Sequence, residues 1–455
     1  MLIKHTPDTF EKMHILGGMA SDDILSRPTA PGRNTPAPYT SARRNPVPGV
    51  YKAAMPNGKF INLMRVMFTD FCMMDCFYCP NSHWVPRKRF AFKVDELANA
   101  FIELRRRHTV DGLFLSSGIA GSGSKTTERL LKVVDAIRNK HGFKGYIHMK
   151  VMPGTDYPLV EEAYRLGTRL SVNIETPTVE MMQRLSTMKD MQRDILDPMQ
   201  WVADLMRRNR GNGRGVTIGQ ATQMVVGAAN ESDWDIFQRM EQLYREWNFK
   251  RVYYAPFQPI RYTPLAEHPA TPLIREHRLY QTDWLKRVYK FTDDEMRLAY
   301  DADGFLPHDE DPKQSIAVHN LDAYPLDVNA ANKEQLLRVP GVGPTSADRI
   351  IANRSAHSID NWRDLQTMGV VRKRAWPFLR FPGHRPPRAR QLKLDLFGEG
   401  AKQARKSEQA ARLGLVQTTP QPSYSPETCG NSATGTSCAG CPLYGSPGHP
   451  GSAVS

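Results

Sequence analysis

The sequence lacks the features of a membrane protein and of a secreted one. No apolar run approaches the roughly 20 residues that are needed to cross a bilayer, and the first ten residues, MLIKHTPDTF, lack the apolar core of a signal peptide. Only six cysteines occur among 455 residues, and three of them are clustered, which is unlike a secreted disulfide framework. We therefore expect a soluble protein of the reducing cytoplasm, without a membrane partner.

Acidic residues are also in short supply. The chain has 47 Asp or Glu against 61 Lys or Arg, a formal net charge of +14, which favours an anionic partner. The excess is concentrated in residues 326–390, where twelve Lys or Arg stand against five Asp or Glu. One seventh of the chain thus carries half of the excess charge, and we expect an anionic molecule to meet this segment.

Changes in composition divide the chain into parts. Residues 25–50 are rich in Pro, Ser, Thr and Arg and have little apolar periodicity, which is typical of a flexible segment. The composition predicts a flexible leader at 1–50, a core at 51–295, a linker region at 296–325, a small helical domain at 326–390 and a low-complexity tail at 391–455.

The core alternates short apolar runs with longer helical patterns. The runs are NLMRVMFT, GLFLSSG, GYIHMKVMP, RLSVNIETP, TQMVVG and RVYYAPFQPI, and amphipathic stretches such as VDELANAFIELRRRH lie between them. This alternation predicts a parallel sheet with crossover helices, and six units are fewer than the eight that close a barrel. The predicted fold class is α/β, a partial (β/α)6 barrel, followed by a C-terminal all-α domain.

Three of the six cysteines lie in FCMMDCFYCP, directly after the first predicted strand. Cys72, Cys76 and Cys79 are therefore expected on the loop at the carboxyl end of that strand, where barrel folds place their chemistry. Thiolates bind soft metals and iron-sulfur clusters. A zinc ion with His83 as its fourth ligand is one alternative. A 4Fe-4S cluster on three thiolates is the other, and it leaves one iron open to a substrate or cofactor.

The pattern Cys72-x3-Cys76-Phe77-Tyr78-Cys79 resembles the signature of radical S-adenosylmethionine (radical SAM) enzymes. The resemblance implies a 4Fe-4S cluster whose open iron is chelated by S-adenosylmethionine. It also implies that an electron from the cluster cleaves the sulfonium and gives a 5′-deoxyadenosyl radical, which removes a hydrogen atom from the substrate. An electron donor such as flavodoxin or ferredoxin is implied as a partner.

The resemblance carries further cofactor-binding positions over to this chain. Tyr78 matches the aromatic residue that lies against the adenine. Ser116, Ser117 and Gly118 stand where the family has a segment that contacts the methionyl amino group, although Ile119 replaces the acidic residue of that segment. Backbone carbonyls are expected to accept those hydrogen bonds instead.

Two later strands supply the remaining cofactor-binding positions. Asn173 and Glu175 alternate on one face of the fourth predicted strand. They resemble the polar pair that holds the ribose hydroxyls and the methionyl carboxylate, and burying them without partners would cost roughly 1–3 kcal/mol each. Val225 and Gly227 resemble the fifth-strand segment beside the adenine.

A second motif lies in VNAANKEQLLRVPGVGPTSADRIIANR, residues 328–354. Two short amphipathic helices are predicted on either side of the turn PGVGP, with inward-facing Leu336, Leu337, Val339, Ala347, Ile350 and Ile351. Glycines permit the tight turn, and N–H groups at the start of the second helix form a phosphate site. The segment resembles a helix-hairpin-helix motif, which binds nucleic-acid backbone, and this implies DNA contacts by Gly341, Val342, Gly343 and Thr345. A hairpin that only packs is the alternative.

A degenerate second copy of the hairpin is predicted in DLQTMGVVRKRAWPFLR, where Arg372, Lys373 and Arg374 would contact phosphates. The cysteine motif and the hairpin together, over residues 55–385, resemble radical SAM proteins assigned to DNA modification or repair. That group is linked by genome association to uracil-DNA glycosylase-like proteins, which are implied as a partner.

The other three cysteines lie in the low-complexity tail. Cys429, Cys438 and Cys441, with His449 beyond them, suit a second iron-sulfur cluster or a zinc ion, or they belong to a mobile, reducible segment. Two alternatives to a radical SAM enzyme acting on DNA stay open: action on RNA, and a non-catalytic iron-sulfur protein that binds nucleic acid. Structural clusters normally take all four ligands from the protein, so the missing fourth cysteine favours the enzyme.

Overall fold

The structure is a computed structural model that describes residues 7–20, 49–54, 60–210, 215–217, 219–384 and 386. All of these belong to the first of the two compact units of the chain, Met1–Pro387. The predicted metal ligands Cys429, Cys438 and Cys441 lie outside the described residues. Within the described part of the chain, no helix combines the length and the apolarity that are needed to cross a membrane.

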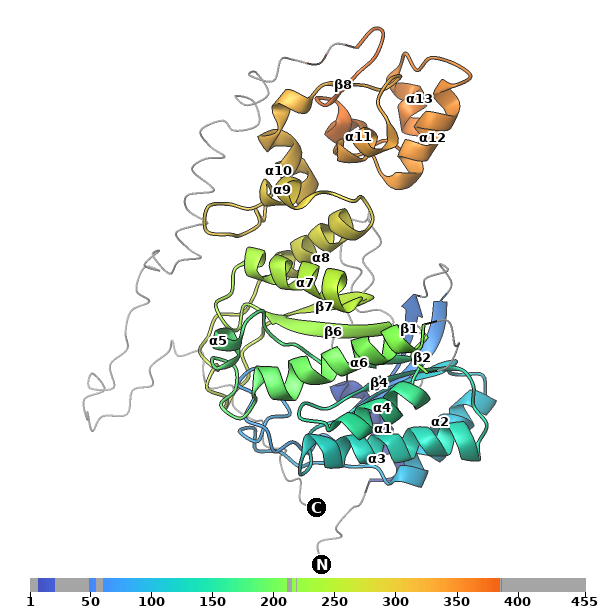
Figure 1. The fold of residues 1–455 in the computed structure, drawn as a ribbon, viewed down its shortest axis with the longest axis vertical. Helices are drawn as coiled ribbons and strands as arrows, with labels where there is room; N and C mark the ends of the chain where they lie inside the picture. The colour runs from blue at the N-terminus through green and yellow to red at the C-terminus, as the bar shows by residue number, and fades with distance from the viewer. Residues whose placement is uncertain are drawn as a thin grey trace, which may run out of the picture. The chain divides into compact units, whose positions relative to one another are not determined.

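A seven-stranded sheet forms the centre of the core (Figure 1). Its strands, in spatial order, are β1 Val50–Ala54, β2 Phe60–Met67, β3 Gly112–Ser116, β4 Tyr146–Lys150, β5 Arg169–Ser171, β6 Gly219–Val226 and β7 Arg251–Pro256. Strands β2 to β7 are all parallel, in chain order, and they correspond to the six predicted runs. The prediction of a partial (β/α)6 barrel is confirmed. The short antiparallel strand β1, which pairs with β2 at the edge, was not predicted.

Helices follow the parallel strands along the chain and cover the sheet (Figure 1). They are α2 Val94–Arg106, α3 Gly123–Asp135 with the π-turn Ala136–Lys140, α4 Tyr157–Leu166, α5 Val179–Met182, the π-turn Met191–Leu196 with α6 Asp197–Arg208, α7 Asp233–Trp247 and α8 Leu273–Arg287. Helix α2 shows why these segments fold as they do, since Leu97 and Phe101 lie one turn apart on its buried face while Arg105 and Arg106 end it. Ser122 and Ser232 cap α3 and α7 through their side chains.

The expected flexible leader contains a helix. Helix α1, Thr9–Met19, begins with a capping box between Asp8 and Glu11. Lys12 Nζ lies 2.9 Å from Glu96 Oε2, and Leu16 is fully buried. The prediction of a flexible leader is therefore wrong for this helix, because a capped apolar segment packs on the core. Residues 21–48, which include most of the Pro-rich stretch, lie outside the described residues.

The region expected as a linker, residues 296–325, is packed structure. It contains the end of α9 Asp293–Arg297, α10 Pro312–His319 and a 3-10 turn at Leu321–Ala323. Leu306 and Ile316 are buried, and the backbone N–H of Leu306 donates to Asp233 Oδ2 at 2.9 Å. The segment therefore connects the core to the C-terminal helices through buried contacts.

The C-terminal domain consists of two consecutive short hairpins. The first is formed by α11 Lys333–Arg338 and α12 Pro344–Arg354, and the second by α13 Trp362–Thr367 and α14 Arg372–Ala375. The predicted inward positions are buried, apart from the half-buried Ile351. The domain is not wholly helical, because β8 Leu326–Asp327 and β9 Leu379–Arg380 pair in parallel. These two-residue strands close the domain at its ends.

Candidate cofactor site and nucleic-acid interface

The cysteine loop begins directly after β2 and rests on the segment that follows β3. Gly118 N donates to Thr69 O at 2.7 Å, and Met73 N donates to Ile119 O at 2.9 Å. A Cβ atom at Gly118 would lie 2.4 Å from Phe71 O, so this position requires glycine. Gly118 thus supports the cysteine loop by close packing, and Ile119 contributes through its carbonyl group rather than its side chain.

The three cysteines differ in their surroundings. Cys76 is buried, whereas Cys72 and Cys79 are partly exposed. Burial raises the pKa of the Cys76 thiol, and the nearby Lys189 opposes this rise. The backbone N–H of Asn81 donates to Cys79 Sγ at 3.4 Å, a contact that stabilises a thiolate. One side of the loop therefore faces the protein interior and the other faces outward.

His83, the fourth ligand in the zinc alternative, lies close to the cysteine loop. Among the described residues, no three His, Cys, Asp or Glu side chains are grouped so that they could hold a single metal ion. His83 Nδ1 lies 3.3 Å from Met73 O, and its ring is tilted by 38° against the ring of Trp84, with 4.7 Å between the centroids.

Arg89 holds the cysteine loop together. Its guanidinium donates to four backbone carbonyls: Asp70 O at 2.8 Å, Asn81 O at 3.1 Å, Ser82 O at 2.8 Å and Val85 O at 2.9 Å. These carbonyls lie on both sides of the cysteines. The planar fork of arginine suits such multiple donation, so Arg89 fixes the two ends of the loop relative to each other.

Replacing Arg89 by methionine is expected to destabilise the loop. Carbonyl groups that are buried without a hydrogen-bond donor cost free energy, and this substitution removes the donor of several carbonyls at once. We therefore expect the free energy of unfolding to fall by about 2–4 kcal/mol. Thermal unfolding and the iron content after reconstitution measure the effect. The exposed neighbour Lys88, replaced by methionine, is the control and should change the free energy of unfolding by less than about 0.5 kcal/mol. Equal effects of the two substitutions would contradict the role of Arg89.

A second link joins the cysteine loop to a distant loop after α5. The buried carboxylate of Asp75 accepts hydrogen bonds from Thr187 N at 2.8 Å, from Thr187 Oγ1 at 2.6 Å and from Ser186 Oγ. Burial raises the pKa of Asp75, but these hydrogen bonds outweigh burial and lower it below the usual value. Ser186 Oγ in turn accepts from Lys189 N at 3.2 Å. Asp75 thus fixes the turn that brings Lys189 to the cysteines.

Lys189 connects three of the predicted site residues. Its ammonium group donates to Tyr78 Oη at 3.0 Å and lies 3.5 Å from Glu175 Oε1. The side chains of Lys189 and Glu175 are only 5% and 8% exposed. Burial lowers the pKa of Lys189, but the negative charges on Cys76 and Glu175 outweigh it and hold the pKa above the usual value. The pKa of Tyr78 is raised by burial and by Glu175.

Glu175 occupies an unusual backbone position. Its φ is +65°, in the left-handed region that residues other than glycine rarely adopt. Glu175 N donates to Gln223 O at 2.9 Å and Val225 N donates to Glu175 O at 2.7 Å, so contacts with β6 hold it there. Strand β5 ends at Ser171, so Asn173 lies beyond the strand on which it was predicted. Of this pair, Glu175 is the one that contacts Lys189 within the described residues.

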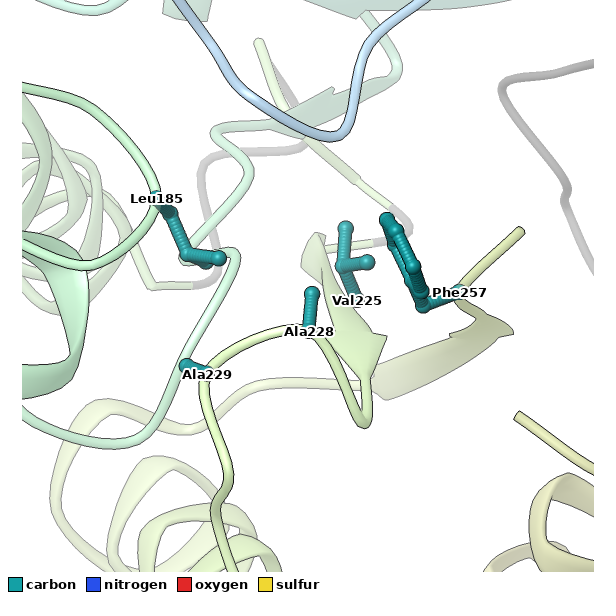
Figure 2. Close-up of a cluster of buried hydrophobic side chains, with 5 residues drawn as sticks. All are labelled: Leu185, Val225, Ala228, Ala229 and Phe257. Carbon is teal, nitrogen blue, oxygen red and sulfur yellow. The ribbon is translucent and has the colours of Figure 1, made fainter. Parts of the chain in front are cut away.

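Tyr78 and Val225 meet in an apolar cluster at the carboxyl ends of the last strands. The cluster consists of Leu185, Val225, Ala228, Ala229 and Phe257, and Tyr78 packs against it. Figure 2 shows Val225 and Phe257 side by side, with Ala228 and Ala229 on the loop that follows β6. Tyr78 and Val225, both predicted from the resemblance to contact the adenine, thus lie on the same apolar cluster.

Gly227 makes hydrogen bonds to residues that do not belong to this apolar cluster. Its N–H donates to Glu231 Oε1, and its carbonyl accepts from His268 Nε2 at 2.8 Å. A Cβ atom there would lie 2.0 Å from Thr271 Oγ1, and φ is +89°. Glu231 lies 3.7 Å from Arg275, which explains why a buried carboxylate is tolerated.

Two buried hydroxyl groups at the same edge of the sheet are unsatisfied. Ser116 Oγ and Thr176 Oγ1 have no hydrogen-bond partner among the described residues. Ser116 is the last residue of β3, and Thr176 follows Glu175. Buried polar atoms are normally paired, so both groups are available to a polar ligand. The predicted Ser117 uses its hydroxyl internally, donating to Gly118 O at 2.7 Å.

A shallow hollow of about 440 Å³ opens beside Cys72. It is lined by Phe71, Cys72, Met73, His83, Val85, Pro86, Arg87 and Arg89. Phe71 and Met73 are exposed apolar side chains on its rim. One face of the cysteine loop is therefore accessible from the surface.

The residues Lys189, Asp75 and Arg89 were not predicted from the sequence. Each acts on the cysteine loop through contacts with residues that are distant along the chain or through backbone carbonyls. Of the three, Asp75 alone lies between two of the cysteines, so its position in the motif could have indicated a role. Lys189 lies in a loop without any motif, so no local signal marked it.

The first hairpin has the geometry that a phosphate-binding turn requires. Gly341 has φ +82°, and a Cβ atom there would lie 2.7 Å from Val371 O. Helix α12 begins after Gly343, and no side chain caps its first turn. Free N–H groups at a helix start attract anions. Thr345 is exposed on this turn, whereas Val342 is buried and contributes only its backbone.

A buried lysine of α10 donates a hydrogen bond to the turn of the first hairpin. Lys313 Nζ donates to Val342 O at 2.6 Å and lies 4.6 Å from the centroid of the Tyr289 ring. Burial and the nearby Arg374 lower the pKa of Lys313 well below its usual value. The hairpin turn is thus attached to the rest of the described unit by a specific contact.

The three basic residues of the second hairpin differ in what they can contact. Arg372 and Lys373 are exposed. Arg374 forms an ion pair with Asp311, so it stabilises the domain and is not free for a phosphate in this arrangement. Phosphate contacts therefore suit Arg372 and Lys373 better than Arg374, because the carboxylate of Asp311, the N-cap of α10, pairs with the charge of Arg374.

Residues 323–373 match the helix-hairpin-helix motif family. No curated protein sequence matches the chain. Among solved structures, the chain is similar to methylornithine synthase (PylB), with 14% identity and a TM-score of 0.38 over 48% of this chain and 60% of that chain. It is also similar to the [FeFe]-hydrogenase maturase HydG from Carboxydothermus hydrogenoformans, with 13% identity and a TM-score of 0.38 over 50% and 51%.

A third similar structure is coproporphyrinogen III oxidase (HemN) from Escherichia coli, a radical SAM enzyme, with 13% identity and a TM-score of 0.31 over 55% of this chain and 56% of that chain. The chain spans less than two thirds of the length of each of these three proteins. Similarity at this level gives no information about activity.

Proposed function

We propose that the chain is a radical SAM enzyme that acts on nucleic acid. One observation carries the proposal: three cysteines on the loop after the first parallel strand lie beside the buried group of Lys189, Glu175 and Tyr78. Three thiols with no fourth cysteine in the same loop suit a cluster that keeps one iron open. The buried ammonium group of Lys189 next to the carboxylate of Glu175 suits a ligand that carries both a carboxylate and an amino group.

The residues present fit such a cofactor. Cys72, Cys76 and Cys79 would hold a 4Fe-4S cluster. Tyr78 and Val225 offer an apolar surface for the adenine, and the unsatisfied hydroxyl of Ser116 offers a partner for a polar group. When bound, the cluster supplies the electron that cleaves S-adenosylmethionine to a 5′-deoxyadenosyl radical, which abstracts a hydrogen atom from the substrate.

The other predicted cofactor positions are proposed on the same basis. Glu175 and Asn173 would contact the ribose and the methionyl end, while the segment of Ser117 and Gly118 would contact the amino group through its backbone. Lys189 is placed to bind the methionyl carboxylate, and it lies 3.5 Å from Glu175 Oε1. The apolar cluster excludes water from this edge of the sheet.

We infer that electrons arrive from an external carrier such as flavodoxin or ferredoxin. The hollow beside Cys72 supports this, since it brings one cysteine near the surface. The carrier would approach on that side of the loop.

We infer that the C-terminal hairpins bind nucleic-acid backbone. The uncapped start of α12 and the exposed Arg372 and Lys373 support this inference. Phosphate contacts give affinity with little sequence information, so selection of the reacting base would occur near the cysteines. A role in DNA modification or repair, together with a uracil-DNA glycosylase-like partner, agrees with this division of tasks.

Replacing Gly341 by valine is expected to weaken nucleic-acid binding about tenfold or more, because the added atoms meet Val371 O and distort the phosphate-binding turn. Fluorescence anisotropy with a labelled oligonucleotide measures the affinity over a range of salt concentrations. Gly142, whose surroundings leave space for a Cβ atom, provides the matched control at positive φ. Unchanged affinity of the Gly341 variant would reduce the hairpin to a packing element.

The test of the substrate class is hydrogen transfer. Deuterium-labelled oligonucleotides, as intact duplex, mismatched duplex, single-stranded DNA and RNA, are incubated with the reduced enzyme and S-adenosylmethionine. We expect deuterium in 5′-deoxyadenosine from DNA, most from mismatched or single-stranded substrates, because a paired base must first leave the stack. Transfer from RNA alone, or from none of them, would contradict the assignment of DNA.

A further inference from the structure

An aromatic cluster lies on the second hairpin, and neither the cofactor site nor the first hairpin uses it. Its rings are those of Trp362, Trp376, Phe381 and His384. The centroids of neighbouring rings lie 5.0 to 5.6 Å apart, and the most exposed ring, Trp376, is 5.6 Å from His384. His384 Nε2 donates to Trp376 O at 3.1 Å, so the cluster is also joined through the backbone.

The aromatic cluster is exposed at Trp376, and basic side chains lie next to it. Trp376 is 38% exposed, and the nearby Val371 is 50% exposed. The Arg372 guanidinium lies over the Trp362 ring at 5.7 Å. Arg372 and Trp376 are four residues apart, at the start and the C-cap of α14, and therefore lie on the same side of this helical turn. Within the described residues neither Arg372 nor Lys373 forms an ion pair, unlike Arg374.

The cluster is next to the turn of the first hairpin. Val371 N donates to Gly341 O at 3.0 Å, and the Cβ position of Gly341 lies 3.3 Å from Ala375 N. A strand whose phosphates contact the first hairpin turn would therefore reach α14 within a short distance. Its bases would meet the exposed face of Trp376.

We propose that Trp376, supported by Trp362 and His384, is a stacking platform for an unpaired base of a single-stranded nucleic acid. This inference rests on the proposed binding of nucleic acid by the hairpins. In a duplex both faces of every base are covered by neighbours, whereas a single strand offers free π-faces to an aromatic side chain. The charges of Arg372 and Lys373 complement the phosphates of the same strand. The preference for single strands is thus a property of the second hairpin.

The experiment measures binding of the full-length protein to two probes, a fluorescein-labelled oligonucleotide of single-stranded DNA and the duplex of the same sequence. Trp376→Ala is expected to weaken binding of the single strand about tenfold, because one stacked base is lost, and to change binding of the duplex less than twofold. Trp376→Phe, which retains a ring, should recover most of the loss. Phe10→Ala removes a ring that is 55% exposed on α1 and is the control.

The outcomes separate this inference from the proposed function. If the unsubstituted protein binds neither probe, both fail. If it binds both probes and Trp376→Ala weakens binding of the two probes equally or not at all, the stacking platform is overturned while the proposed function stands. The same holds if Trp376→Ala lowers only the melting temperature, because another part of the chain or a second protein then covers Trp376. A single strand that contains 5-iodouracil, cross-linked to the unsubstituted protein by light, should attach to Trp376 or Trp362, and attachment only elsewhere would also overturn it.

Discussion

Replacing Cys72, Cys76 and Cys79 together by alanine is expected to reduce the iron of the reconstituted cysteine-loop site from about four atoms per chain to none, because no other ligand set for a cluster lies at this loop. Cleavage of S-adenosylmethionine should fall to background. Iron analysis, the visible absorption of the cluster and quantification of 5′-deoxyadenosine measure the effect. Retention of cleavage by the triple variant would contradict the assignment of these cysteines.

The chain contains a matched control for this experiment. Cys429, Cys438 and Cys441 form a second set of three thiols in the tail. Their replacement by alanine should leave cleavage of S-adenosylmethionine intact. If the tail binds a second cluster, the total iron of this variant will be lower than that of the unsubstituted protein, and if it does not, the iron will be unchanged.

Replacing Lys189 by methionine is expected to lower the rate of cofactor cleavage about 100-fold, with iron content changed less than twofold. The substitution removes the buried positive charge between Tyr78 and Glu175, and it leaves the carboxylate of Glu175 buried without its partner. Binding of S-adenosylmethionine should weaken together with the rate, because the ammonium group is proposed to hold the methionyl carboxylate. Equilibrium binding and single-turnover cleavage separate the two effects.

Two further variants test whether Lys189 acts through its charge. Lys189→Arg keeps the charge and should recover part of the rate, while Lys125→Met removes an exposed lysine and should have no effect. In a Glu175→Gln background, Lys189→Met should destabilise the fold less than it does alone, because no buried carboxylate is then left unpaired. If Lys189→Met loses iron and cofactor cleavage in equal proportion, Lys189 supports the loop and does not bind the cofactor.

The parts that were predicted from the sequence depend on local patterns. Each of the six parallel strands is a short apolar run between helical patterns, so it can be recognised without knowledge of distant residues. Tyr78 and Val225 were predicted from the resemblance alone, and they lie close together because the carboxyl ends of parallel strands share one edge of the sheet. Helix α1 was missed although Asp8 and Glu11 form a capping box, because the Pro-rich stretch that follows it dominated the composition of the leader.

The parts that were not predicted depend on contacts across the fold. Asp75 meets Ser186 and Thr187 more than a hundred residues away, and only the folded chain brings Lys189 to Tyr78. Glu175 was expected in a regular strand but takes a left-handed conformation, which contacts with β6 stabilise. The pairing of Arg374 with Asp311 could not be foreseen either, since a run of three basic residues gives no sign of which one has an acidic partner.

Reductive cleavage of S-adenosylmethionine by the reconstituted protein tests the central claim most directly. The full-length protein is loaded with iron and sulfide without oxygen, reduced with dithionite, and incubated with S-adenosylmethionine in the presence and absence of DNA. Radical SAM chemistry at Cys72, Cys76 and Cys79 predicts 5′-deoxyadenosine and methionine in equal amounts, at a rate that DNA raises. A protein that holds a reduced cluster but forms no 5′-deoxyadenosine under either condition would contradict it.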